Sequence, residues 1–121
     1  GRDVRQGELR ALTRYRNEHP QDARARLLLG HAYMQRGWFS HAIEQYERAM
    51  ALDLGARGNP ELLENLLRAA RTETLAEAAG EMVSRIYGAE ASSELQRAIA
   101  RTHDAGERAR LEALAARLGP A

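Results

Sequence analysis

The four histidines are the side chains in this sequence best suited to hold a metal ion. His31 and His41 fall on different helices of one expected hairpin, and the four residues show no recognisable metal-ligand spacing. The chain has no cysteine, which excludes disulfides, thiolate metal ligands and cysteine nucleophiles. We therefore expect no metal site.

The acidic residues give no sign of a catalytic pair. Glu44, Glu64 and Glu81 each lie four residues before an arginine, which is the spacing of a solvent-exposed helix face. The chain also contains no phosphate-binding loop, dinucleotide-binding, nucleophile-elbow or zinc-protease motif. We expect neither a cofactor nor enzymatic activity.

Arginine supplies every positive charge, because the chain has no lysine. Together with the many alanines, this usage is typical of a GC-rich bacterial genome. Residues 1–26 carry a net charge of +3, but aromatic side chains do not alternate with the arginines there, and the whole chain is only +1. Nucleic-acid binding through this segment is therefore a weaker alternative.

Helices are expected to position all of these side chains. Every long segment has helical periodicity and none alternates as a strand does, and alanine and leucine supply most of the apolar residues. No apolar run approaches the ~18 residues that cross a bilayer, and we expect a cytoplasmic location. The sequence predicts an all-α fold of about seven antiparallel helices over residues 3–18, 23–36, 40–52, 59–71, 74–87, 93–102 and 104–118.

Local signals predict where several of these helices begin. Asn59-Pro60 combines a side-chain cap with proline in the first turn. Three capping boxes, in which the first and fourth residues satisfy each other's backbone groups, open the last three helices. They are Thr74 to Glu77, Ser93 to Gln96, and Asp104 to Glu107.

Gly30 interrupts the apolar run LLLGHAY in the second expected helix, where glycine costs about 1 kcal/mol relative to alanine. Two antiparallel helices approach closely only where side chains are small at the crossing. Ala42 and Ala49 supply such positions on the third helix. We therefore expect a close crossing, with the surrounding volume filled by Leu29, Tyr33, Phe39, Ile43 and Tyr46.

These residues also follow a known repeat pattern. Residues 23–56 resemble a tetratricopeptide repeat (TPR) at the following positions: Leu29, Gly30, Tyr33, Gly37, Phe39, Ala42, Ile43, Tyr46, Ala49, Met50, Leu52 and Asp53. Residues 1–22 look like the second helix of a truncated repeat, and residues 57–90 like a degenerate repeat. Residues 91–121 look like a final helical hairpin of HEAT type, at Asp104, Arg108, Arg110, Leu114 and Leu118.

The resemblance implies one domain, residues 1–121, folded as a right-handed superhelical α-solenoid. TPR modules bind extended peptides or partner helices on their concave face, so the chain is expected to be a protein–protein interaction scaffold. Since it begins at Gly1 rather than Met, we interpret it as a piece of a larger bacterial protein, by analogy a kinase-linked signalling protein. The alternatives are a homo-oligomerisation module and, more weakly, an arginine-dependent nucleic-acid binder.

Candidate contact residues follow from the same resemblance. They lie on the first helix of each hairpin. The alternative is that they are ordinary solvent-exposed residues without a binding role. The residues are Arg24, Leu27, His31, Met34 and Gln35 on one helix, and Glu61, Asn65 and Arg68 on the other. Trp38, in the turn between the paired helices, is a further candidate anchor for a partner or a second copy of the chain, because tryptophan is enriched in interface hot spots.

Overall fold

The computed structural model describes the backbone of residues 2–119 and the side chains of residues 7–119. Over this part of the chain the secondary structure is helical and contains no strand, which confirms the all-α prediction. The α-helices are α1 (Arg2–Glu18), α2 (Ala23–Gln35), α3 (Phe39–Leu52), α4 (Pro60–Ala70), α5 (Ala76–Ile86), α6 (Ser92–Arg101) and α7 (Ala105–Leu118). Two short 3₁₀ helices, η1 (Leu54–Gly58) and η2 (Gly88–Ala91), lie between them.

The chain divides into two compact units, Gly1–Gly58 and Asn59–Ala121. The division comes at the end of η1, two residues after the expected end of the repeat at residue 56. Each unit has its own helical packing.

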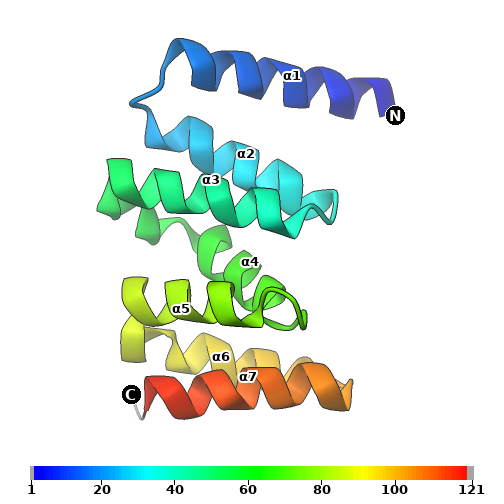
Figure 1. Cartoon of the computed structure of the whole chain (residues 1–121), viewed down its shortest axis with the longest axis vertical. Helices are drawn as coiled ribbons and strands as arrows, with labels where there is room; N and C mark the ends of the chain where they lie inside the picture. The colour runs from blue at the N-terminus through cyan, green and yellow to red at the C-terminus, as the bar shows by residue number, and fades with distance from the viewer. Residues whose placement is uncertain (1, 120–121) are drawn as a thin grey trace. The chain divides into compact units, whose positions relative to one another are not determined.

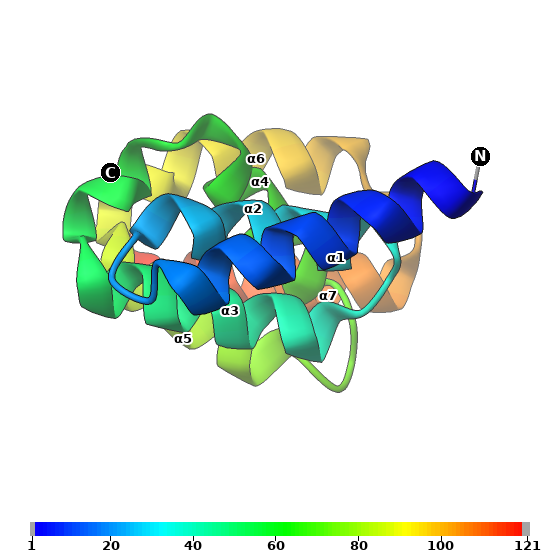
Figure 2. The ribbon, with the colours of Figure 1, turned by 90° about the horizontal axis from the view of Figure 1, so that it is seen from above.

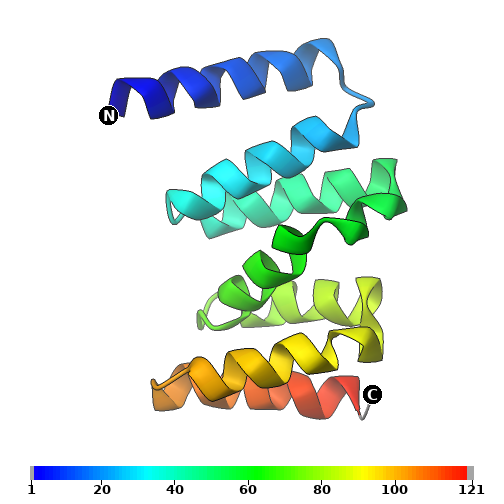
Figure 3. The same ribbon diagram turned by 180° about the vertical axis from the view of Figure 1, so that it is seen from behind.

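In the first unit, α1 packs antiparallel to α2, and α2 and α3 form a tight antiparallel hairpin (Figures 1 and 3). Gly37 makes the turn between them with a φ of +78°, a left-handed conformation that favours glycine. The side chains of the α2–α3 interface are almost fully buried and pack around the ring of Tyr46. Its innermost side chains are Leu29, Met34, Ala42, Tyr46 and Ala49.

Gly30 allows the close crossing that the sequence predicts. A Cβ atom at this position would lie 2.3 Å from Cε1 of Tyr46, well inside any permitted contact. The space left open by the glycine is thus filled by the Tyr46 ring, and the Tyr46 hydroxyl lies 2.7 Å from Nδ1 of His31. Ala42 and Ala49 lie on α3, like Tyr46, and are fully buried as expected. Tyr33 and Phe39 are only half-buried.

In the second unit, α4 pairs with α5 and α6 pairs with α7, each as an antiparallel hairpin (Figures 1 and 3). Helix α7 also packs against α4 and α5. Across this packing, Nε of Arg110 donates a hydrogen bond of 2.7 Å to the carbonyl oxygen of Arg71. The fully buried side chains include Leu62, Leu66, Val83, Leu95 and Leu111.

Two of the expected helix starts are confirmed. The Asn59 side chain accepts a hydrogen bond of 2.9 Å from the Glu61 amide, with Pro60 as the first residue of α4. The Asp104 side chain accepts one of 2.9 Å from the Glu107 amide at the start of α7.

The capping boxes at Thr74 and Ser93 are wrong. The carbonyl oxygen of Thr72 accepts hydrogen bonds from the amides of Leu75 and Ala76, so a backbone turn leads into the helix and the Thr74 side chain caps nothing. Helix α5 therefore begins at Ala76 without a side-chain cap. Helix α6 continues directly from η2, and this leaves Ser93 inside the helix.

Candidate functional site

Helix α2 does not present the contact face expected from the sequence. Leu27 and His31 are only 6% and 8% exposed, and Met34 is buried completely. Packing encloses these side chains, and the His31 ring lies edge-on against Tyr46 with 5.5 Å between ring centroids. Of the five candidates on this helix, only Arg24 and Gln35 are exposed, at opposite ends. Leu27 and His31 therefore leave little surface on this helix for contact with a partner.

The candidates on α4 belong to the second unit. Glu61 and Arg68 are exposed, and Asn65 between them is half-buried. They are spaced four and three residues apart, so they share one side of α4.

Trp38 is the candidate with the clearest structural setting. It is 46% exposed and lies directly after the turn at Gly37. The Trp38 amide donates a hydrogen bond of 2.9 Å to the carbonyl oxygen of Tyr33, and the Gly37 amide donates one of 3.1 Å to that of Met34. These bonds form the Schellman motif, which places the side chains of the first and last residues against each other. The motif thereby fixes the backbone that carries the exposed indole.

Aromatic and cationic side chains surround the indole of Trp38. The ring centroid of Trp38 lies 5.8 Å from that of Tyr33 and 6.1 Å from that of His41. The guanidinium carbon of Arg36 lies 5.3 Å from the Trp38 ring centroid, within cation–π range. The turn thus presents a cluster of three aromatic rings with one positive charge beside it.

A groove opens between this cluster and α1. We call it the Trp38 groove, and its volume is about 560 Å³. Helix α1 supplies one wall and overlies α2 and α3 in Figure 2. The lining residues are Leu9, Arg10, Thr13, Arg14, Asn17 and Glu18 from α1, with Tyr33, Trp38 and His41 opposite.

The wall on α1 is positively charged. Arg10 and Arg14 are exposed and lie one turn apart, and neither forms an ion pair with another described side chain. Glu18, also exposed, adds one negative charge to the lining. The groove therefore combines an aromatic side with two arginines that form no ion pair among the described side chains, and its lining carries a net positive charge.

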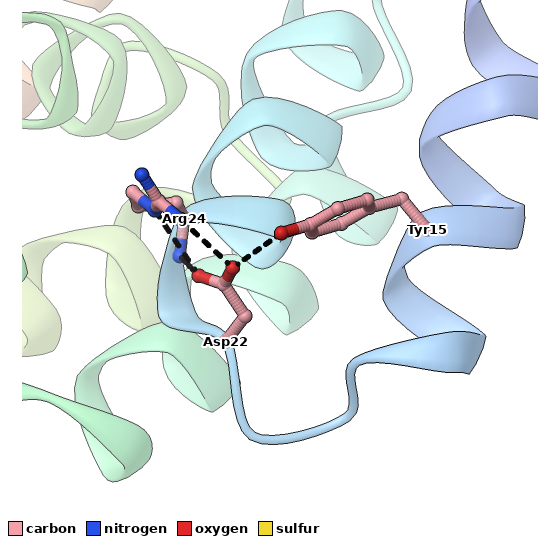
Figure 4. A network of polar contacts seen from close by, with 3 residues as sticks. All are labelled: Tyr15, Asp22 and Arg24. Atoms are coloured by element: carbon pink, nitrogen blue, oxygen red, sulfur yellow. Dashed lines mark hydrogen bonds and ion pairs between the residues drawn. The ribbon is translucent and has the colours of Figure 1, made fainter.

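A polar network at the α1–α2 turn holds this wall in place (Figure 4). The Tyr15 hydroxyl donates a hydrogen bond of 2.9 Å to Oδ2 of Asp22. Oδ1 of Asp22 accepts one of 2.9 Å from the Arg24 amide, which makes Asp22 the N-cap of α2. One carboxylate thus joins the end of α1 to the start of α2.

The same contacts change the acidity of Asp22. Hydrogen bonds from the Arg24 side chain lower the pKa of Asp22 to about 2, with further lowering by the Tyr15 hydroxyl and the Arg24 amide. The hydrogen bond to Asp22 in turn raises the pKa of Tyr15. Arg24 is therefore an internal partner of Asp22, at an ion-pair distance of 3.3 Å.

Sequence reasoning found Trp38 but missed the wall on α1. The signal that could have found it is the series of positions 10, 13, 14 and 17, which share one side of a helix and include two arginines. Pairing that side with Trp38 requires the tertiary packing of α1, which the repeat pattern does not specify.

No protein-family model matches this chain, and neither a curated protein nor a solved structure matches it. Within residues 2–119, no helix is long and apolar enough to cross a membrane. The described residues likewise contain no group of three histidine, aspartate or glutamate side chains that could hold a metal ion.

Proposed function

We propose that this chain is a TPR-like helical-repeat module that binds a peptide or partner protein and has no catalytic activity of its own. The α2–α3 hairpin supports the proposal, because its close crossing at Gly30 and Tyr46 is the packing that the repeat resemblance requires. The proposal includes a right-handed superhelical α-solenoid and a recruitment role within a larger bacterial signalling protein.

The Trp38 groove is the proposed binding site. The observation that carries this assignment is a tryptophan that follows directly on a Schellman motif and keeps nearly half its surface exposed beside an open groove. Large aromatic side chains in such positions supply much of the energy of protein interfaces. The concave face expected from the sequence loses Leu27 and His31 to burial, and Arg24 is engaged with Asp22.

Homo-oligomerisation is the second candidate function. The same exposed indole favours it, since two copies of the chain would each bring a Trp38 ring to a shared interface. Light scattering over a range of concentrations separates the two functions, because a peptide-binding module stays monomeric in the absence of its partner.

A peptide library displayed on phage tests the proposed function. The full chain is immobilised, and binders are counter-selected against the Trp38→Ala variant. We expect enriched peptides whose affinity falls by at least about tenfold in Trp38→Ala, the loss of ~1.4 kcal/mol that marks an interface anchor.

The matched control is Leu54→Ala, because Leu54 is also an exposed large apolar residue of the first unit and does not line the groove. This variant should bind the selected peptides as the wild type does. Peptides that bind wild type and Trp38→Ala equally, or a selection with no enrichment, would contradict the assignment.

A further inference from the structure

We propose that the partner segment bound in the Trp38 groove is acidic and carries a bulky aliphatic side chain. This inference rests on the proposed function and adds the chemistry of the ligand. Carboxylates of the segment would contact Arg10 and Arg14 on α1, and its apolar side chain would cover the exposed face of Trp38.

The charge on α1 favours an acidic partner. Arg10 and Arg14 lie four residues apart on one side of α1, and like charges at this spacing destabilise a helix. None of the ion pairs among the described side chains involves either residue. Elsewhere the chain compensates such charges locally, as Arg48 with Glu44 and Arg85 with Glu81 show. An anionic partner would relieve the repulsion that the free protein retains here.

The opposite side of the groove favours an apolar side chain in the partner. Tyr33 and Trp38 form an aromatic surface that lines the groove. Arg36 beside the Trp38 ring adds a third positive charge, and its buried Nη2 atom makes no hydrogen bond with any described residue. A segment with carboxylates flanking an aliphatic side chain matches both sides of the groove at once.

A peptide fits these features better than a nucleic acid does. The first unit has ten arginines against seven acidic residues, a modest excess, and the groove lining itself includes Glu18. Nucleic-acid grooves follow a strongly positive track over several nucleotides, whereas the arginines that line this groove, among the described residues, are limited to Arg10 and Arg14. The groove therefore suits a short ligand with a few charges.

Fluorescence of Trp38 gives a direct test, because no other tryptophan contributes to the signal. The probes are three capped hexapeptides, EELLEE, QQLLQQ and RRLLRR, titrated into the full chain at low salt. We expect EELLEE to bind at least about tenfold more tightly than QQLLQQ, RRLLRR to bind more weakly still, and added salt to reduce the difference.

Arginine variants locate the charge effect. The double variant Arg10→Gln/Arg14→Gln should lower the affinity for EELLEE to that for QQLLQQ. The control, Arg101→Gln/Arg108→Gln, removes the same charge from exposed positions of the second unit and should leave binding unchanged. Circular dichroism establishes that each variant is folded.

Several results would overturn this inference. Equal affinity for EELLEE and QQLLQQ would reject the acidic partner while leaving peptide binding intact. Tighter binding of a (dT)12 oligonucleotide than of EELLEE would assign the groove to nucleic acid, and a concentration-dependent dimer abolished by Trp38→Ala would assign it to a second copy. Absence of binding by all three peptides would also reject the inference, whereas the phage selection decides the proposed function separately.

Discussion

Gly30 shows how one residue type records a tertiary contact in the sequence. Glycine inside an apolar helical run is unfavourable unless something must approach the backbone. The sequence therefore predicts a close crossing before the partner atom is known. The structure identifies that partner as the Tyr46 ring, because a Cβ at Gly30 would lie 2.3 Å from it.

Gly30→Ala should destabilise the protein by about 2 kcal/mol, because the strain of an overpacked core outweighs the higher helix propensity of alanine. Tyr46 is fully buried and its hydroxyl lies 2.7 Å from Nδ1 of His31, so a displacement of its ring disturbs the packing around it. Urea denaturation followed by circular dichroism measures the change.

Gly7→Ala is the matched control for this substitution. Gly7 lies in α1, and nothing approaches the position of its missing Cβ within 4 Å. Alanine there should raise stability by up to about 1 kcal/mol. Equal effects at positions 7 and 30 would show that the close crossing does not constrain the hairpin.

The burial of His31 and Leu27 could not be predicted from the sequence. Periodicity places them on the side of α2 away from Leu29, and histidine is ordinarily a surface residue. The hydroxyl that hydrogen-bonds His31 belongs to Tyr46, fifteen residues away, and no local pattern connects the two. The burial of Leu27 and His31 likewise depends on the packing of neighbouring helices.

Asp22 shows how the start of an element is coupled to its neighbour. Its carboxylate caps α2 and also accepts a hydrogen bond from Tyr15 of α1. Aspartate directly before a helical run is a common start signal in sequences. The link to Tyr15 follows only from the packing of α1.

Stability should depend on the ionisation of Asp22. Contacts with Arg24, Tyr15 and the Arg24 amide lower its pKa from 3.8 to about 2 in the folded protein. A lowered folded-state pKa means that the contribution is fully present above about pH 4 and disappears as the pH falls through about 2. Asp22→Asn should therefore be less stable than wild type at pH 6, and the difference should shrink towards pH 2.

Chemical denaturation at a series of pH values measures this difference. Glu112→Gln serves as the control, because Glu112 is exposed and makes no hydrogen bond or ion pair in the described part of the chain. A difference between wild type and Asp22→Asn that stays constant from pH 6 to pH 2 would refute the ionic role of the cap.

Helix starts were predictable where one side chain acts alone and not where the backbone supplies the acceptor. Asn59 and Asp104 both accept from the helix amides as expected. At Thr74 and Ser93 the preceding chain forms a turn or a 3₁₀ helix, and its carbonyl groups take that role. A four-residue motif does not show whether the preceding chain continues directly into the helix.

The contrast between Asp104 and Ser93 makes a quantitative prediction. Asp104→Ala should cost about 1 kcal/mol of stability because it leaves an amide of α7 without its cap. Ser93→Ala should change stability by less than about 0.5 kcal/mol, since Ser93 is exposed inside α6. Thermal melts of both variants compare the two sites, and an equal loss would restore the capping box at Ser93.

At the scale of the whole molecule, the helical class followed from periodicity, whereas the division into two units after Gly58 did not. Charge follows the same division, because Gly1–Gly58 carries a net +3 and Asn59–Ala121 a net −2. Neither property locates a binding site. The Trp38 groove emerges only when α1 is packed beside the α2–α3 turn.

An NMR titration of the ¹⁵N-labelled full chain with the EELLEE peptide locates the binding site directly. Shift changes should concentrate in residues 9–18 and 33–41 and include the indole N–H of Trp38. Changes concentrated instead around Glu61, Asn65 and Arg68, or an unchanged spectrum at saturating peptide, would contradict binding in the Trp38 groove.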